Sequence, residues 1–267
     1  MQANGNSLGS LDPSQLRIAC VHSGSKVAME HYNELSSVYS FVPPKQSDVI
    51  LALGGDGLML HALHSYMHLN KPIYGMNCGT IGFLMNDYST EQLAQRILSA
   101  DSFVLHPIAM KALTTEGKVE EALAFNEVAV IRASGQSANI RVSVDDVERL
   151  ENYIGDGLIV STPAGSTAYN LSAHGPIIPL GSNLLALTPV SPFRPRRWKG
   201  ALLPHTCTIT MVNLDPEKRP LVTSADFRDI LNVVTVTMRE DHSHSVQMLF
   251  DKDHSLEERI LREQFTA

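Results

Sequence analysis

The chain has 267 residues, of which 43% are hydrophobic and 18% are charged, and its formal net charge is −7. These ordinary globular values exclude a disordered or fibrous chain, and the acidic balance argues against a broad basic surface. No apolar run reaches the ~18 residues that a membrane-spanning helix needs. We therefore expect one large or two modest domains, with neither nucleic acid nor membrane as a partner.

The cysteines and the N-terminus indicate the compartment. Cys20, Cys78 and Cys207 are odd in number and far apart, which argues against a disulfide framework. Residues 1–15 are polar and lack the basic and then apolar pattern of a secretory signal. We expect a reduced, cytoplasmic protein.

The first hundred residues alternate between strand-like and helix-like segments. Apolar runs predict strands over Ile18–Val21, Val49–Leu53 and Pro72–Met76. A helix is expected directly after Gly57, and another over Thr90–Leu98 with Thr90 as its N-cap. This βαβ pattern predicts an N-terminal α/β domain with a mostly parallel sheet, over residues 1–102.

From Phe103 onward, alternating stretches separated by turn residues predict a C-terminal antiparallel β-sandwich over residues 103–249. Pro189–Pro195 is expected to be a loop, because proline cannot donate to a central sheet ladder. The end of the chain, 250–267, is helix-like from Ser255 to Phe265 and either returns to the first domain or packs on the second. The expected strands are Met110–Thr114, Leu123–Arg132, Ile140–Val144, Gly157–Val160, Cys207–Val212 and Val233–Met238.

A glycine loop, Gly54-Gly55-Asp56-Gly57, follows the buried strand at the sheet edge where α/β folds bind ligands. Its glycines allow close backbone approach, and the following helix would direct free N–H groups at an anion. Beside phosphates, Asp56 can accept a proton from an attacking hydroxyl or help to hold Mg²⁺. The alternative is a tight turn with Asp56 as a helix cap. The loop matches neither a Walker A motif nor a dinucleotide fingerprint.

Two segments of the second domain also carry polar groups suited to a ligand. Asn126-Glu127 interrupts an apolar strand, and its amide and carboxylate can bind a ribose diol or a carboxamide, or else mark a strand end or bulge. The stretch from Asp156 to Ser172 leads from a strand into small residues that let a ligand lie against the backbone. Its hydroxyls on Ser166 and Thr167 can cap a helix or bind a sugar or phosphate, and Tyr169 can stack on a base. The alternative is a strand-turn-helix with a structural role alone.

In these motifs and their order, the sequence resembles the bacterial NAD kinase family over about Ile18 to Phe265. The Gly-Gly-Asp-Gly loop alone is shared with lipid kinases and phosphofructokinase, whereas the Thr-Pro-x-Gly-Ser-Thr-Ala-Tyr segment is more specific. The resemblance implies transfer of the ATP γ-phosphate to the adenosine-ribose 2′-hydroxyl of NAD. It further implies a divalent metal with ATP, Mg²⁺ being expected, and a homodimer or homotetramer with a shared site. ATP or polyphosphate would be the donor.

The same resemblance assigns roles residue by residue. Asp56 matches the general base and also a position that binds NAD, and Asp156 matches the carboxylate near the nicotinamide end. The remaining residues match positions that bind NAD: Gly57, Asn126, Glu127, Ala164, Thr167, Ala168, Tyr169, Asn170, Leu171 and Ser172. The metal ligands are not assigned.

Some positions depart from the family pattern. Phe227-Arg228 follows Asp226 where the family often has Gly or Ser and then Gln, so contacts from that loop are open. His61 stands where the family often has Arg, and it shares a predicted helix side with His64 and His68, which we expect to be exposed rather than metal-binding. A basic cluster, Arg194–Lys199, is expected at a subunit contact or an anion, or as a solvated loop.

The sequence motifs are also compatible with two other functions. The Gly-Gly-Asp-Gly loop also fits a diacylglycerol or sphingosine kinase, which has no need for Asn126-Glu127. A non-catalytic nucleotide sensor on the same fold would bind NAD without making NADP.

Overall fold

The computed structural model describes residue 6, residues 8–79 and residues 82–252, and it divides into two compact units. The first runs up to Leu105 and resumes at His244, and the second is His106–Ser243. The helix-like segment Ser255–Phe265 lies outside the described residues. In the part of the chain that is described, no helix has the length and hydropathy that crossing a membrane requires.

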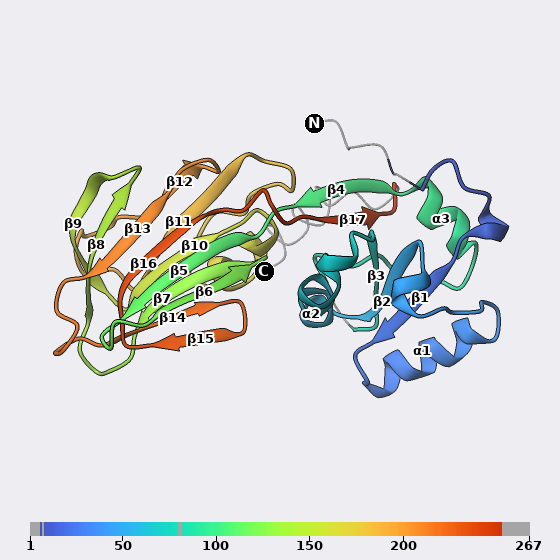
Figure 1. Cartoon of the computed structure of the whole chain (residues 1–267), viewed down its shortest axis with the longest axis horizontal. Helices are drawn as coiled ribbons and strands as arrows, with labels where there is room; N and C mark the ends of the chain where they lie inside the picture. The colour runs from blue at the N-terminus through green and yellow to red at the C-terminus, as the bar shows by residue number, and fades with distance from the viewer. Residues whose placement is uncertain (1–5, 7, 80–81, 253–267) are drawn as a thin grey trace. The chain divides into compact units, whose positions relative to one another are not determined.

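The first unit is built on a five-stranded sheet in the order β1-β2-β3-β17-β4 (Figure 1). Three of its four pairings are parallel, and only β17 with β4 is antiparallel, which confirms the predicted mostly parallel α/β architecture. Its strands are β1 (Ile18–His22), β2 (Val49–Gly54), β3 (Ile73–Asn77), β4 (Asp101–Leu105) and β17 (Val246–Phe250), and its helices are α1 (Lys26–Ser36), α2 (Asp56–Tyr66) and α3 (Leu93–Ser99).

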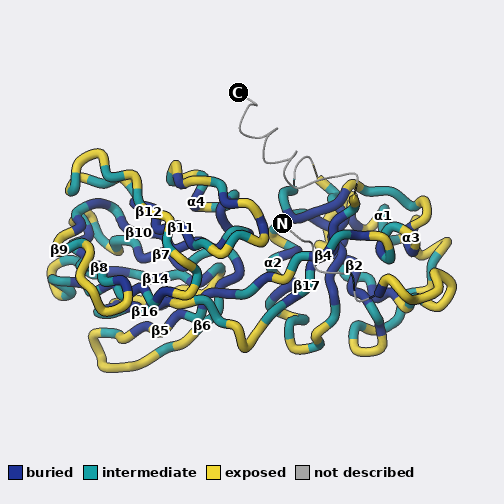
Figure 2. Tube along the Cα trace, turned by 90° about the horizontal axis from the view of Figure 1, so that it is seen from above, coloured by how far each residue is buried: buried dark blue, intermediate teal, exposed yellow. Residues whose placement is uncertain are grey.

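Local chemistry explains where these elements begin. All residues of β2 are buried, as a continuous apolar run predicts for a strand covered on both faces (Figure 2). The hydroxyl of Ser25 accepts a hydrogen bond from the Ala28 N–H and caps α1. The prediction of Thr90 as the cap of the next helix is wrong. That helix, α3, begins at Leu93, and its N-cap Gln92 has a left-handed backbone and makes no side-chain cap bond.

The second unit consists of two six-stranded antiparallel sheets, in the orders β12-β11-β10-β7-β14-β15 and β6-β5-β16-β13-β8-β9. One hydrophobic cluster takes buried side chains from both sheets, including Val128 and Leu158 from the first and Met110 and Met211 from the second. The sheets therefore pack face to face, as predicted for a sandwich.

The sandwich strands alternate between buried and more exposed residues where one face meets solvent, as in β8 and β13. The bounds are β5 (Ile108–Thr114), β6 (Val119–Ala124), β7 (Glu127–Arg132), β8 (Ala138–Val144), β9 (Val147–Gly155), β10 (Gly157–Ser161), β11 (Leu184–Val190), β12 (Ala201–Pro204), β13 (Ile209–Asn213), β14 (Leu221–Ala225), β15 (Arg228–Leu231) and β16 (Val233–Glu240), with one short helix, α4 (Tyr169–Ser172).

Two strand predictions in this unit are wrong. The expected single strand Leu123–Arg132 is two strands, β6 and β7, which belong to different sheets and separate at Phe125-Asn126. Pro189 was expected in a loop but lies in β11, opposite Leu158 of β10. It is tolerated there because the other neighbour, β12, pairs only as far as Leu187.

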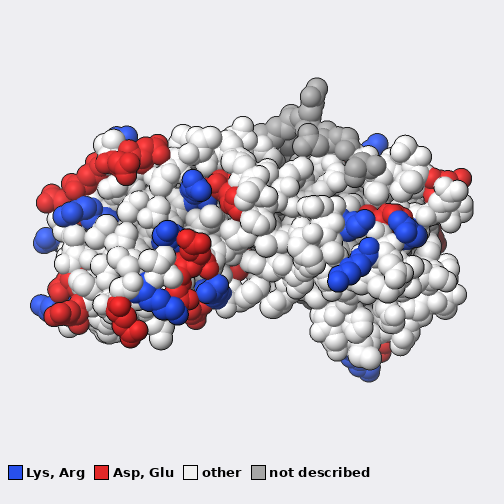
Figure 3. Space-filling model, viewed as in Figure 1, with Lys and Arg blue, Asp and Glu red and all other residues white. Residues whose placement is uncertain are grey.

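Charged side chains of both signs are interspersed on the face of the molecule drawn in Figure 3. Acidic side chains gather over β8 and β9, whose hairpin carries Asp145, Asp146, Glu148 and Glu151.

Candidate functional site

Asp56 lies where β2 ends and α2 begins, as the first residue of the helix. Its two carboxylate oxygens each accept a backbone N–H: Oδ2 from Phe83 at 2.9 Å and Oδ1 from Leu84 at 3.0 Å. The half-buried carboxylate is therefore held by the segment that follows β3, rather than capping its own helix. Gly57 beside it is exposed, and a Cβ atom there would meet nothing within 4 Å.

The segment after β3 lies beside the glycine loop, as its position after a neighbouring parallel strand implies. Gly54 is opposite Asn77 in the sheet, and the Cys78 N–H donates to the Gly54 carbonyl oxygen at 2.8 Å. A Cβ on Gly82 would lie 3.2 Å from Asp56 Oδ1. The Gly54–Gly57 loop and the described residues after β3 therefore lie together at the carboxyl ends of β2 and β3.

In the second unit, Asn126 and Glu127 lie where the chain passes from one sheet of the sandwich to the other. The Asp226 carboxylate fixes this crossing by accepting the backbone N–H groups of Phe125, Asn126 and Glu127, at 2.7, 3.0 and 3.3 Å. Asn126 Oδ1 and Glu127 Oε2 are both buried, and neither has a hydrogen-bond partner in the described chain. The polar interruption in the sequence therefore marks the end of one strand and the start of another.

The segment Thr162–Ser172 packs directly against this crossing. The Thr162 N–H donates to the Asn126 carbonyl oxygen at 2.9 Å, and the Thr162 hydroxyl donates to the Phe125 carbonyl oxygen at 2.6 Å. The Tyr169 backbone N–H hydrogen-bonds the Glu127 carboxylate. Three segments that are distant in sequence, around residues 126, 165 and 226, are thus joined by hydrogen bonds.

Members of the Thr162–Ser172 segment differ in what their side chains contact. The Asn170 side chain is fully buried and donates to the carbonyl oxygens of Ser166 and Pro176, and it accepts the Thr188 hydroxyl at 2.6 Å. The Ser166 hydroxyl bonds Pro163 and Ile178 instead of capping a helix. Ala164 is buried, Thr167, Ala168 and Leu171 are half-buried, and Tyr169 and Ser172 are exposed.

Asp156, after β9, forms an ion pair with Arg132 at the end of β7, with Nε and Oδ1 2.5 Å apart. Arg132 also donates to the Ser134 carbonyl oxygen at 2.6 Å, which fixes the guanidinium. These residues and Tyr169 line an open hollow of about 420 Å³, whose remaining walls are Ile131, Ala133, Ser134 and Val190. The structure therefore brings Asp156 and Tyr169 together, with Arg132 as an additional member.

The environment of Glu127 changes its acidity. Burial, and then the nearby charge of Asp226, raise the pKa of Glu127 from 4.5 to about 7, although the Tyr169 N–H acts in the opposite direction. Between pH 4.5 and about 7, Glu127 therefore keeps its proton in the folded chain but has lost it in the unfolded chain. This group makes the free energy of unfolding fall as pH rises from about 4.5 through about 7.

Replacing Glu127 with glutamine is expected to remove this pH-dependent contribution, because the glutamine amide stays uncharged and burying it removes no charge from water. Relative to the original chain, Glu127→Gln gains stability at pH values above 7 that it does not gain near pH 4.5. Urea unfolding at both ends of this range measures the difference. Glu116→Gln, at an exposed turn, is the control. Parallel stability–pH curves for the original chain and Glu127→Gln would contradict the account.

Gly165 is the residue whose small size allows the segment to approach the crossing. A Cβ atom at this position would overlap the carbonyl oxygen of Asn126. Gly165→Ala is expected to lower the free energy of unfolding by about 1–3 kcal/mol, the usual cost of overpacking, because backbone must move to relieve the overlap. Urea unfolding measures it, with Gly135→Ala as control, since a Cβ there meets nothing within 4 Å. Equal effects of the two substitutions would show that this close approach is unimportant.

The segment Arg194–Lys199 is tied to β9. Arg194 exchanges both backbone hydrogen bonds with Ile154, and the guanidinium carbons of Arg194 and Arg196 lie 5.7 and 5.9 Å from the Phe193 ring centroid. The four basic side chains are exposed, and Trp198 packs on the sandwich core. Their role at a subunit contact or an anion stays a prediction.

Two residues of this site were not assigned from the sequence. The sequence pattern gives Asp226 no binding role, although its carboxylate holds the crossing at Asn126-Glu127. Arg132 is predicted only as the last residue of a strand. The signal available for Arg132 was a charge directly after the apolar run Val128–Ile131, but nothing in that pattern points to Asp156, 24 positions away.

Comparison with known proteins places these features in context. A family model described as the ATP-NAD kinase N-terminal domain matches residues 12–100, and one described as the ATP-NAD kinase C-terminal domain matches residues 125–226. An NAD kinase from Brucella suis is 51% identical over 252 residues, covering 94% of this chain and 98% of that protein. One from Cereibacter sphaeroides is 48% identical over 249 residues, covering 93% and 98%.

Solved structures share the fold. A crystal structure of yeast NADH kinase complexed with NADH aligns with a TM-score of 0.79 at 18% identity, covering 94% of this chain and 88% of that one. An NAD kinase from Archaeoglobus fulgidus in complex with ATP aligns with a TM-score of 0.71 at 22% identity, covering 92% and 98%.

Proposed function

This chain belongs to the NAD kinase family, and we propose that it transfers the γ-phosphate of ATP to the 2′-hydroxyl of the adenosine ribose of NAD, giving NADP. The assignment rests on identity near 50% over more than nine-tenths of the chain. A lipid kinase and a non-catalytic sensor are the alternatives, and they serve below as outcomes of the test.

One observation supports the nucleotide site in particular. Asn126 Oδ1 and Glu127 Oε2 are buried acceptors without a partner in the described chain. Leaving a buried acceptor unpaired costs about 1–3 kcal/mol, so such a pair is expected where a ligand supplies the donors. The hydroxyls of a ribose are donors of this kind. Asn126 and Glu127 therefore bind NAD in this proposal, with Thr167, Ala168, Tyr169, Leu171 and Ser172 as the adjoining contacts.

Neighbouring residues then take supporting roles. Asn170 and Ala164 are buried, and the Asn170 amide is hydrogen-bonded to Ser166 and Thr188. In this proposal the two residues support the backbone that lines the NAD site and do not contact NAD through their side chains. Arg132 orients the Asp156 carboxylate at the hollow beside Tyr169. Asp156 binds the nicotinamide end of NAD.

Asp56 is the general base in this proposal, with Gly57 beside it at the NAD site. Each of its carboxylate oxygens accepts one backbone N–H, which holds the carboxylate in place at the start of α2. The carboxylate takes the proton of the 2′-hydroxyl, the ribose oxygen forms a bond to the γ-phosphorus, and the bond to the leaving ADP oxygen breaks. Positioning and charge stabilisation supply the remainder of the rate enhancement.

A divalent cation, Mg²⁺, accompanies ATP in this scheme. The carboxylate of Asp56 is an oxygen ligand of the type that Mg²⁺ prefers, and Mg²⁺ is usually held by one or two carboxylates together with substrate phosphates and water. When bound, the ion supplies neutralisation of the phosphate charge. We further propose a cytoplasmic homodimer or homotetramer, consistent with three free thiols at Cys20, Cys78 and Cys207.

The direct test incubates the purified full chain with NAD, ATP and Mg²⁺ and detects NADP with an NADP-specific dehydrogenase. We expect NADP to accumulate with time and enzyme concentration, and a parallel reaction with polyphosphate to show whether that donor serves. NAD binding without NADP formation would favour a sensor, and phosphorylation of diacylglycerol but not NAD would favour a lipid kinase. Either result would overturn the proposal.

A further inference from the structure

A cluster of metal-binding side chains lies in the second unit, among residues to which the proposed kinase reaction gives no role. In the part of the chain that the structure describes, His205, Glu240 and His242 are the one group of at least three such side chains that could hold a metal ion. Their ligand atoms all lie within 4.8 Å of one another. The histidines of α2 and the turn after it, His61, His64 and His68, do not form such a group.

The three side chains converge on one oxygen atom. Glu240 Oε2 lies 2.5 Å from His205 Nδ1 and 3.2 Å from His242 Nε2. The Glu240 side chain is only 10% exposed, so its carboxylate is largely withdrawn from water between two imidazoles. On a tetrahedral zinc ion, with bonds of about 2.0–2.2 Å, neighbouring ligand atoms lie about 3.4 Å apart. Both separations from Glu240 Oε2 are shorter than this, so the two imidazoles move outward from the carboxylate to admit the ion.

The backbone brings these residues together from both sheets of the sandwich. Glu240 ends β16, and His242 follows two residues later. His205 follows β12 of the other sheet, where its N–H donates to the Asn183 carbonyl oxygen at 3.1 Å. A metal held by all three would therefore connect the two sheets where the strands end.

A further histidine lies beside the cluster. The His106 ring is 4.8 Å from the His242 ring, measured between centroids, and the Asp241 N–H donates to the Pro107 carbonyl oxygen at 2.8 Å. That backbone bond holds the segment of His106 against the segment of His242. The imidazole of His242 is thus supported on a second side, which favours a defined ligand direction.

We propose that His205, Glu240 and His242 bind one Zn²⁺ ion, with water as the fourth ligand, and that this ion ties the two sheets of the sandwich together. Two imidazoles and a carboxylate suit zinc, whereas Mg²⁺ prefers oxygen ligands and water. The site is therefore separate in chemistry from the Mg²⁺ that accompanies ATP. The metal needs a lone pair on both His205 Nδ1 and His242 Nε2, so a proton that either atom donates toward Glu240 Oε2 moves to the other nitrogen of that ring or to solvent.

The test uses the full chain without an affinity tag, freed of metal with a chelator and kept without nucleotide. Co²⁺ titration followed by visible absorption reports ligand geometry, and Zn²⁺ then competes for the same site. We expect one equivalent of Co²⁺ with a tetrahedral spectrum, its displacement by Zn²⁺ but not by Mg²⁺, and a higher Tm with Zn²⁺.

Variants locate the site and allow for misfolding. His205→Ala and Glu240→Gln are expected to weaken Co²⁺ binding by at least about 100-fold. Loss of a residue that only hydrogen-bonds a metal ligand costs up to about 100-fold, so loss of a ligand itself should cost at least as much. His68→Ala, an exposed histidine of the first unit, should bind as the original chain does. Circular dichroism of each metal-free variant checks that it is folded. Absence of stoichiometric binding, or binding equally strong in the Glu240→Gln variant, would overturn the proposal.

Discussion

Asp56→Asn is expected to lower kcat for NADP formation by about 10²–10⁴-fold, the usual contribution of a general base. An amide of similar shape cannot take the proton of the 2′-hydroxyl. KM for NAD should change far less than kcat, because the contacts proposed at Asn126 and Glu127 are kept, whereas accepting the proton matters only in the transition state. Steady-state kinetics with NAD as the varied substrate, under saturating ATP and Mg²⁺, measures both parameters.

The control for this substitution must separate chemistry from loop structure. The carboxylate of Asp56 accepts two backbone N–H groups, and an asparagine amide oxygen can replace only one of them. Tm and NAD affinity of Asp56→Asn therefore report any rearrangement of the loop, and Glu91→Gln, at an exposed carboxylate of the same unit, controls for loss of one charge. Turnover within a few-fold of the original chain would contradict the role of Asp56.

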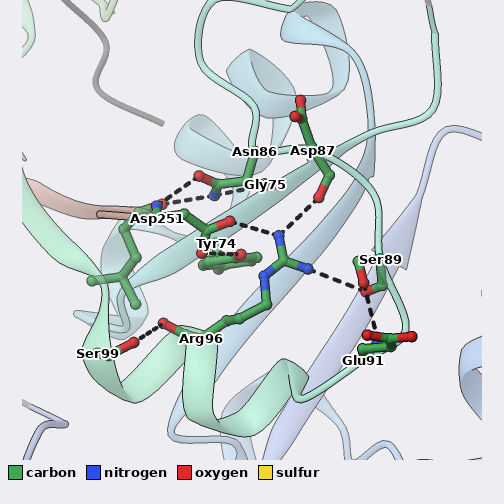
Figure 4. Close-up of polar contacts among 10 residues, drawn as sticks. Tyr74, Gly75, Asn86, Asp87, Ser89, Glu91, Arg96, Ser99 and Asp251 are labelled. Atoms are coloured by element: carbon green, nitrogen blue, oxygen red, sulfur yellow. Dashed lines mark hydrogen bonds and ion pairs between the residues drawn. The ribbon is translucent and has the colours of Figure 1, made fainter. Parts of the chain in front are cut away.

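Asp251→Ala is expected to lower the free energy of unfolding by about 3 kcal/mol, near the lower end for breaking a buried ion pair. Asp251 follows β17 and accepts the Arg96 guanidinium at 2.6 Å and the hydroxyl of fully buried Tyr74 at 2.6 Å (Figure 4). Its backbone N–H also donates to Asn86 Oδ1 at 2.9 Å. Removing the carboxylate takes one acceptor from the buried Tyr74 hydroxyl, and it leaves the largely enclosed guanidinium with the carbonyl oxygens of Ser89 and Asp87 but without its ion-pair partner.

A second arginine–aspartate pair in the same unit provides a matched comparison. Arg17 and Asp48 are also 2.6 Å apart, but the Arg17 side chain is 58% exposed, whereas Arg96 and Asp251 are 21% and 14% exposed. Arg17→Ala should therefore cost only about 0–1 kcal/mol, as surface pairs do. Urea unfolding measures both variants. Equal losses would show that enclosure does not set the strength of the Arg96–Asp251 pair.

The parts of the fold that could be predicted from the sequence are those whose burial leaves a local pattern. The apolar run Val49–Leu53 predicts a doubly covered strand, and the glycine loop after it predicts the strand-to-helix turn that carries Asp56. Strands β4 and β17 were not predicted, because β17 pairs with β3 across more than 160 positions of sequence. Such pairing depends on tertiary packing that no short window contains.

Within the candidate site, residue types could be predicted more readily than their partners. Asn126 and Glu127 stand out as polar residues in an apolar stretch, but the sequence predicts one strand because apolar residues lie directly on both sides of them. The carboxylate that separates those runs, Asp226, lies 100 positions away from Asn126. Asn170 matched a family position, yet its bonds to Ser166 and Thr188 appear only when the segment is folded.

The most direct test of the central claim is a crystal structure of the full chain with NAD bound. The proposed chemistry requires an Asp56 carboxylate oxygen to lie within hydrogen-bond distance of the 2′ oxygen of the adenosine ribose, or one water molecule away. We predict that separation. A complex in which NAD occupies the Asn126–Glu127 site and the Asp56 carboxylate is farther from the 2′ oxygen than one bridging water would contradict the account.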